Sequence, residues 1–373
     1  MSSTLPDKNG VEPLQYKENW PAARQRLLAF WEHEIIDRVC VGISAPREKR
    51  VLLPESPDIE FQQTDPDLHQ ARLHAEFGNR YYGGESLPIS GTHLGYAFFG
   101  GKPAFERGAS GYGITDYMFV DPVIEDWQRT PYRFDANSKW CRRFLEITRR
   151  EYAESHGKYL STLGAVLAPT DVLGLLRGYG PLCFDMFDNP EQVRQALREL
   201  RRAYRWAWGW FHDLSDADRN GSEIVSMWGP GRNVCLSCDF SCLIGPELYR
   251  EFVMPEMEEL TRWFDHSFYH LDGEDALQHI PALLELEHLD GIQFNPGHRD
   301  AHYPVTRWLP LFKQIQDAGK LVQLSASHEE VETVLEVLGP RGVFISTGAE
   351  SIEAAETLLR NAERWSCRQP LRQ

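Results

Sequence analysis

Cysteine is scarce in this chain of 373 residues: there are seven, an odd number, and they are scattered along the sequence. A secreted fold held by disulfides needs paired cysteines in a short chain, so the count favours a reduced, cytoplasmic protein. Long apolar runs are absent as well. No stretch reaches the roughly 18 apolar residues of a membrane-spanning helix, and residues 1–15 lack the apolar core of a secretion signal. We therefore expect no membrane insertion.

Basic residues are outnumbered: 39 lysines and arginines stand against 55 acidic residues, which gives a net charge of −16. Nucleic acids and acidic membranes bind clustered basic side chains, so this balance predicts neither as a partner. Hydrophobic residues make up 42% of the chain, enough for a large core. We expect a disordered tail over residues 1–15 and a single domain over residues 16–366.

The most informative pattern lies in residues 267–297, SFYHLDGEDALQHIPALLELEHLDGIQFNPG. A buried strand ends in HLDG (270–273), a helical pattern follows, and a second short strand spans 291–294. This is one strand–helix–strand unit of a β/α barrel. Side chains two apart on a strand point to the same side, so His270 and Asp272 share a face. An imidazole and a carboxylate there can hold a divalent metal or act as an acid/base pair.

Similar patterns along the chain predict eight strands, most of them followed by a helix. The expected fold class is therefore α/β, a (β/α)8 TIM barrel with an N-terminal helical extension over residues 17–37. Residues 91–127 are rich in glycine and aromatics. We expect them to form either a long loop over the barrel mouth, contributing His93 and Tyr96, or a surface β-hairpin packed on the barrel. The predicted strands are 39–43, 86–90, 158–167, 223–228, 266–271, 291–294, 320–325 and 343–347.

Active sites of such barrels lie at the carboxyl ends of the strands. Two ionisable groups placed together there are costly unless they are paired or used, which favours a catalytic role for His270 and Asp272. Asp239 is the third candidate catalytic residue. A single polar residue at a strand end is more often structural, and Arg177 has an alternative as an ion pair with a nearby aspartate. The candidate substrate-binding residues are Arg177, Trp228, Gln293, His298, His93 and Tyr96.

Three motifs resemble the uroporphyrinogen decarboxylase superfamily, which includes corrinoid-dependent methyltransferases. They are HLDG (270–273), the segment from Asp171 to Gly178 that reads DVLGLLRG, and the segment from Ile244 to Pro255 that reads IGPELYREFVMP. The resemblance covers roughly residues 171–359. In the methyltransferase branch the matching strand ends in His-x-Cys-Gly and binds zinc. Here Asp272 replaces that cysteine, and the last strand, VFISTGAES, has none.

The resemblance implies an enzyme that moves a methyl group between a small substrate and a corrinoid protein. Zinc or another divalent metal would bind His270 and Asp272, and cobalamin would be carried by the partner protein. The arginine-containing N-terminal motif of the tetrapyrrole decarboxylases is not present. Two alternatives stay open: a decarboxylase or lyase that acts on a small carboxylated substrate, and a non-catalytic ligand-binding barrel. We also expect a homodimer through helix 17–37 or helix 190–212, since two-fold dimers are the commonest assembly.

Overall fold

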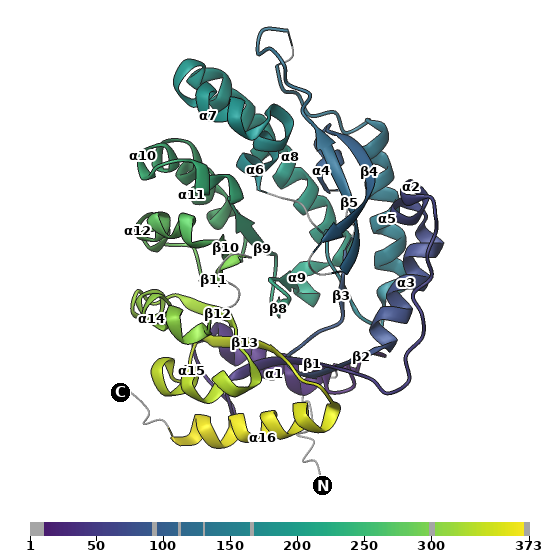
Figure 1. The fold of residues 1–373 in the computed structure, drawn as a ribbon, viewed down its shortest axis with the longest axis vertical. Helices are drawn as coiled ribbons and strands as arrows, with labels where there is room; N and C mark the ends of the chain where they lie inside the picture. Colours follow the sequence, from purple (N-terminus) through teal and green to yellow (C-terminus); the bar gives the residue numbers. More distant parts are fainter. Residues whose placement is uncertain are drawn as a thin grey trace.

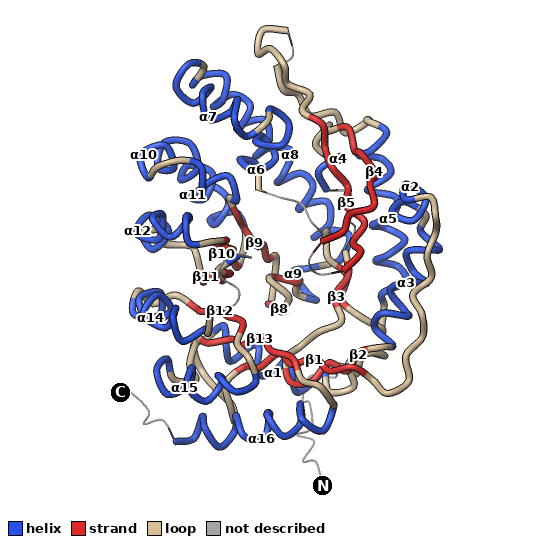
Figure 2. The backbone as a smooth tube through the Cα atoms, viewed as in Figure 1, coloured by secondary structure: helices blue, strands red, loops and turns tan. Residues whose placement is uncertain are grey.

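The computed structural model describes residues 11–91, 95–110, 113–129, 131–164, 168–297 and 303–368. It shows a mixed α/β protein, which confirms the predicted class. Strands lie around the middle of the molecule and helices cover their outer side (Figure 1, Figure 2).

The bounds of the elements follow the chain from the N-terminus. The strands are β1 (Cys40–Pro46), β2 (Arg80–Gly84), β3 (Ile89–Ser90), β4 (Lys102–Ser110), β5 (Gly113–Asp121), β6 (Leu160–Ser161), β7 (Ser222–Ile224), β8 (Met227–Gly229), β9 (Asn233–Ser237), β10 (His266–Asp272), β11 (Gly291–Asn295), β12 (Leu321–Ser325) and β13 (Val343–Gly348). The helices are α1 (Trp20–Trp31), α2 (Ile59–Thr64), α3 (Pro66–Gly78), α4 (Gly95–Phe98), α5 (Lys139–Ser155), α6 (Pro169–Arg177), α7 (Tyr179–Asp188), α8 (Pro190–Ser215), α9 (Ala217–Asn220), α10 (Pro246–Leu248), α11 (Met254–Trp263), α12 (Ile280–Leu284), α14 (Leu309–Asp317), α15 (Val331–Leu338) and α16 (Ile352–Arg368). Short 3-10 helices span Asp239–Leu243, Glu274–His279, Val305–Trp308 and His328–Glu330.

In the described residues, six parallel strands form the main sheet, in the order β1–β13–β12–β11–β10–β9. Strand β2 adds an antiparallel edge next to β1. Strands β3 and β6 form a separate parallel pair, and no ladder between described residues joins them to the main sheet. Seven of the eight predicted ranges therefore contain a strand that pairs in parallel, whereas closure into a barrel stays a prediction.

The predicted strand over residues 223–228 is wrong. Strands β7 and β8 form a tight antiparallel hairpin there, and the parallel neighbour of β10 is β9 instead. Val225 and Ser226, at the turn, have φ angles of 48° and 61°. Such turns normally use asparagine or glycine, so the segment IVSMW gave no sign of one. The turn is held by two hydrogen bonds of 2.7 Å, from Ser226 N to Glu223 Oε1 and from Gln323 Nε2 to Val225 O.

The expected long loop over the mouth is also replaced. Its central part is the antiparallel hairpin of β4 and β5, which is the alternative expected from the sequence. The hairpin contacts α2, α4 and α6, and Figure 1 shows it on the side of the molecule where α4 and α5 lie. His93 lies outside the described residues. For Tyr96, only the backbone position in α4 is described.

Apolar residues pack on both faces of the main sheet. On the outer face, alternate strand residues such as Tyr269 and Leu271 are buried against the helices. On the inner face, α1 inserts Phe30 between two strands, with ring centroids 6.4 Å from Phe268 and 6.2 Å from Phe344. The β7–β8 hairpin joins this inner cluster through residues that include Trp228. The amino half of the inner face is thus filled by aromatic and aliphatic side chains.

The aromatic residues that suggested a dimer surface are mostly used within the chain. Trp20, Phe30 and Trp31 of α1 are only 6%, 2% and 7% exposed. On α8, Trp208 is buried, whereas Trp206 is 41% exposed and stacks on Phe98. Helix α1 therefore offers little aromatic surface, and the homodimer stays a prediction.

Residues 1–10 of the expected tail lie outside the described residues. Further along it, Gln15 N donates a hydrogen bond of 2.8 Å to Gly157 O, so the chain contacts the domain before residue 16. Among the helices described, none has the length and apolar character needed to span a bilayer.

Replacement of Phe30 by alanine should lower the free energy of unfolding by about 3–5 kcal/mol, because it empties the centre of the inner aromatic cluster. Urea denaturation followed by circular dichroism measures the change. Phe187→Ala is the matched control: its side chain is 70% exposed, so the change should stay within about 0.5 kcal/mol. Equal losses in the two variants would contradict the assignment of Phe30 to the core.

Candidate functional site

Polar side chains gather at the carboxyl ends of β9, β10 and β11, on the inner face. Register places His270 opposite Ser237 on one side and Gln293 on the other. His270 and Asp272 alternate with the buried Tyr269 and Leu271, so they point away from the outer helices, as the strand period predicts. Both side chains therefore lie on the same face of the sheet, as the sequence predicts.

The His270 ring is fixed by its neighbour on β11. Its Nδ1 lies 2.6 Å from Oε1 of Gln293. An amide oxygen can only accept, so Nδ1 carries the proton and Nε2 is the atom available for proton exchange or for a metal. Gln293, predicted as a substrate-binding residue, contacts His270 and thereby positions it.

Asp272 is half-buried at the end of β10. Its Oδ1 is buried and has no hydrogen-bond partner among the described residues. Leaving a buried polar atom unpaired is costly, and such atoms in folded proteins usually meet a ligand, an ion or a water molecule. This oxygen is the clearest sign that the space beside His270 accepts another molecule.

Two further aspartates add carboxyl groups next to this pair. Asp239 begins the 3-10 helix after β9. Burial of its carboxyl group and the negative charge of Asp272 raise the pKa of Asp239, while His270 opposes this rise. Asp171, in the first turn of α6, is fully buried and accepts hydrogen bonds from Ser237 Oγ at 3.0 Å and Phe240 N at 2.9 Å. Burial, and then the charge of Asp239, raise the pKa of Asp171 to about 7.

A third carboxyl group with a raised pKa, that of Glu256, lies on α11. Glu256 is fully buried, and its only donors in the described structure are the Thr170 hydroxyl at 2.8 Å and the Thr170 N–H at 3.4 Å. Burial raises the pKa of Glu256 to about 8, despite those bonds. Its bonds join α11 to the start of α6, at the residue next to Asp171.

Arg177 is placed in an ion pair. Its Nε lies 2.5 Å from Asp185 Oδ2, its Nη1 donates to Ile124 O and Glu125 O, and its guanidinium lies over the Trp127 ring. The alternative expected from the sequence, an ion pair with a nearby aspartate, is the one observed. With these donors already bonded, Arg177 offers little to an anionic substrate.

The expected position of Trp228 is wrong. Because residues 223–228 form a hairpin and not a parallel strand, Trp228 lies at the amino ends of the strands and is only 1% exposed. Its Nε1 donates to Asn220 O at 2.9 Å. His298 lies outside the described residues.

The observed side chains fit the predicted metal site only in part. His270 Nε2 and the unpartnered Asp272 oxygen are suitable donors, and the bond to Gln293 resembles the outer-shell contact that orients metal-binding histidines. A catalytic zinc usually takes three protein ligands. In the parts of the chain that are described, no group of three or more His, Cys, Asp or Glu side chains is arranged to hold an ion.

Sequence reasoning missed two buried polar side chains, Gln323 and Asp171. Gln323 on β12 is 1% exposed, in register with Gln293, and its Oε1 has no partner among the described residues. Asp171 is only the first residue of the DVLGLLRG motif in the sequence, which predicts no role for it. A glutamine in the middle of an apolar strand, LVQLS, was the available signal for the first. The second needed the contact between α6 and the loop after β9, which no local pattern shows.

Comparison with known structures gives fifteen chains of similar fold. One is a methyltransferase from Methanosarcina mazei, with a TM-score of 0.59 and 11% sequence identity over 92% of this chain and 98% of that chain. At this identity the likeness shows the fold alone. No protein-family description matches the sequence, and no curated protein matches it.

Glu256→Gln should flatten the dependence of stability on pH. The folded-state pKa is raised, so the wild-type carboxyl contributes its stability below about pH 4, where the unfolded chain is also protonated, and loses it as pH rises through about 8. Between pH 5 and pH 8 the variant should therefore gain on the order of 1 kcal/mol or more relative to wild type. Urea denaturation at several pH values measures this difference.

Glu258→Gln serves as the control, because Glu258 lies on the exposed side of the same helix. Its stability should follow the wild-type pH profile. A Glu256→Gln profile parallel to wild type would show that the Glu256 carboxyl is not protonated more readily in the folded state.

Proposed function

We propose that this chain is an enzyme of the methyltransferase branch of the uroporphyrinogen decarboxylase superfamily. Its small substrate binds on the inner face, at the carboxyl ends of β9, β10 and β11. The observation that carries the proposal is the pair of His270, oriented by Gln293, and Asp272, whose buried oxygen has no partner among the described residues. The likeness in fold to a methyltransferase supports it. In this proposal the main sheet and the β3–β6 pair belong to one closed barrel.

The reaction requires a proton as well as a methyl acceptor. In a methyl transfer, the bond between the methyl carbon and a heteroatom of the donor breaks. The methyl group leaves without the bonding electrons, and the heteroatom keeps the pair and takes up a proton. Asp239 supplies that proton, because its raised pKa keeps the carboxyl protonated to higher pH than an exposed aspartate. A corrinoid carried by a separate partner protein supplies the nucleophile that accepts the methyl group.

The other residues bind and orient the substrate. His270 Nε2 accepts a hydrogen bond from a substrate hydroxyl or amine, and its ring cannot turn because Nδ1 is held by Gln293. The Asp272 oxygen accepts a second. Burial, and then charge repulsion from Asp239, raise the pKa of Asp171, since two close carboxylates resist ionising together. Zinc or another divalent ion at His270 and Asp272, when bound, would take the place of these two hydrogen bonds and would polarise a substrate oxygen.

The decarboxylase or lyase alternative is weakened by one contact. Carbon–carbon cleavage next to a carboxylate needs a cationic group to hold the substrate, and Arg177 was the candidate. The Asp185 carboxylate already neutralises it. A non-catalytic barrel would not need carboxyl groups with raised pKa values beside an oriented histidine, since these reduce stability at neutral pH.

Asp239→Asn should lower the rate of methyl transfer by about 10²-fold or more, since it removes the proton donor. Formation of methylcobalamin from cob(I)alamin and a panel of O-, N- and S-methyl donors measures the rate. In wild type the rate should fall as pH rises through the raised pKa of Asp239, and this limb should be missing from the variant.

Asp317→Asn, on the exposed side of α14, is the control and should keep the wild-type rate and pH profile. Failure of every donor class to yield methylcobalamin would count against methyl transfer. Release of CO2 from carboxylic acids in the same preparation would support the lyase alternative.

The metal is tested separately. Freshly purified protein should contain about one divalent ion per chain, as a single catalytic site requires, and His270→Ala should lose it. Mass spectrometry of the elements in the protein measures this, with His288→Ala, an exposed histidine, as control. Metal-free protein with full activity would contradict the expectation and leave His270 as a plain acid/base.

A further inference from the structure

A cavity of about 560 Å³ lies at the opposite end of the strands from His270. It is lined by Tyr152 in the last turn of α5, by Ser215 at the end of α8 and by Trp228 of the β7–β8 hairpin. Trp228 belongs to the cluster that fills the amino half of the inner face, which places the pocket at that end. We call this cavity the amino-end pocket. Nothing in the proposed reaction uses it.

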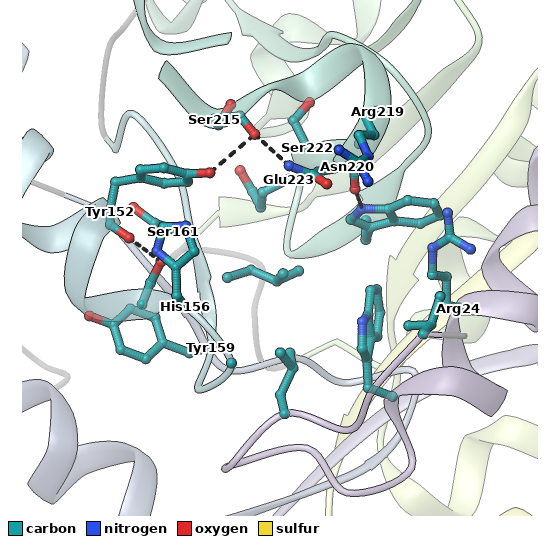
Figure 3. Close-up of a pocket in the computed structure, with 18 of the residues that line it drawn as sticks. Arg24, Tyr152, His156, Tyr159, Ser161, Ser215, Arg219, Asn220, Ser222 and Glu223 are labelled. Atoms are coloured by element: carbon teal, nitrogen blue, oxygen red, sulfur yellow. Dashed lines mark hydrogen bonds between the residues drawn. The ribbon is translucent and has the colours of Figure 1, made fainter. Parts of the chain in front are cut away.

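Its polar wall is basic, although the chain as a whole has a net charge of −16. Arg24, Arg219 and His156 line the pocket. Figure 3 shows the two arginines on one side, and Tyr152 and His156 on the other. Within the described parts of the chain, the side chain of Arg219 forms no ion pair or hydrogen bond. A guanidinium group facing a cavity without a carboxylate partner is a ready site for a phosphate or carboxylate.

Arg24 is held in position by an aromatic ring. Its guanidinium lies 4.5 Å from the centroid of the Trp228 indole. The indole is itself fixed, because its Nε1 donates to Asn220 O and its ring packs edge-on against Trp20. A basic group anchored in this way loses less freedom when it binds an anion.

The helix end at the pocket does not oppose an anion. The carboxyl end of a helix carries partial negative charge on its unbonded carbonyl groups. Here Ser215 O, the last carbonyl of α8, accepts from Asn220 Nδ2 at 2.8 Å and from Tyr152 Oη at 3.2 Å. Those bonds satisfy the group that would otherwise repel a negative ligand.

The remaining wall suits a small apolar body. Val11, Leu14 and Leu160 line the pocket and are only half-buried, so part of their apolar surface faces it. Glu223 lies at the foot of the strained β7–β8 turn and is the acidic side chain of the lining. Burial raises the pKa of Glu223, which reduces its repulsion of an anion.

We propose that the amino-end pocket binds a small organic anion, distinct from the substrate at His270. Its phosphate or carboxylate group contacts Arg24 and Arg219. Its apolar part lies against Leu14 and Leu160.

Isothermal titration calorimetry of the full chain with phenyl phosphate, benzoate and benzyl alcohol tests this proposal. The two anions should bind and the uncharged alcohol should bind at least about tenfold more weakly, since it lacks the charge-assisted contacts. The tighter of the two anions identifies the head group. Arg219→Gln should weaken binding by about tenfold, and Arg24→Gln by a similar factor. Arg202→Gln, an exposed arginine on α8, should bind as wild type does.

His270→Ala separates this site from the proposed active site. It should keep the wild-type affinity for the anion, whatever its effect on methyl transfer. Loss of binding in His270→Ala would place the anion at the carboxyl ends of the strands and overturn the proposal. Unchanged binding in Arg219→Gln, equal binding of benzyl alcohol, or no heat from either anion at millimolar concentration would overturn it too. Arg219 is exposed, so its variant should fold normally.

Discussion

The packing of α1 and the β7–β8 hairpin against the inner face of the sheet is the contact on which the rest of the structure depends. Strands curved around a common centre leave a space that has to be filled, because empty volume in a core is costly. Phe30 and the residues around it fill the amino half of that space. Polar side chains are thereby confined to the carboxyl half, where His270 and Asp272 lie, and to the rim of the amino-end pocket.

The side chains at the carboxyl half of the inner face lower the stability of the fold. Asp171 and Glu256 are both fully buried, and the pKa of each is raised because burial disfavours the charged form. Few cationic groups compensate them, and their hydrogen bonds come mainly from Thr170, Ser237 and the backbone of Phe240. A fold under selection for stability alone would place apolar residues at these positions. Their concentration beside one oriented histidine is what a site for proton transfer requires.

The β7–β8 hairpin shows why one strand was assigned wrongly. The segment IVSMW predicts one continuous strand, since every residue in it is compatible with a strand. Val225 and Ser226 nevertheless adopt positive φ, which costs energy for residues with a Cβ atom. Two hydrogen bonds offset this cost: Gln323, nearly a hundred positions away, donates to Val225 O, and Ser226 N donates to the Glu223 carboxylate. As a direct result, Trp228 lies at the amino-end pocket and not at the carboxyl ends of the strands, where the sequence predicted it.

The sequence by itself determined the α/β class, most strands and helices, and the shared face of His270 and Asp272, because these follow from local periods of two and 3.6 residues. Tertiary structure alone decided what each side chain does. In the folded chain, Gln293 is hydrogen-bonded to His270, and Arg177 forms an ion pair with Asp185. Asp171 accepts a hydrogen bond from the loop after β9. Such choices depend on which distant residue supplies a hydrogen bond once the strands are in register. Local pattern carries no information about that partner, because hydrogen bonds and charges act through space and not along the chain.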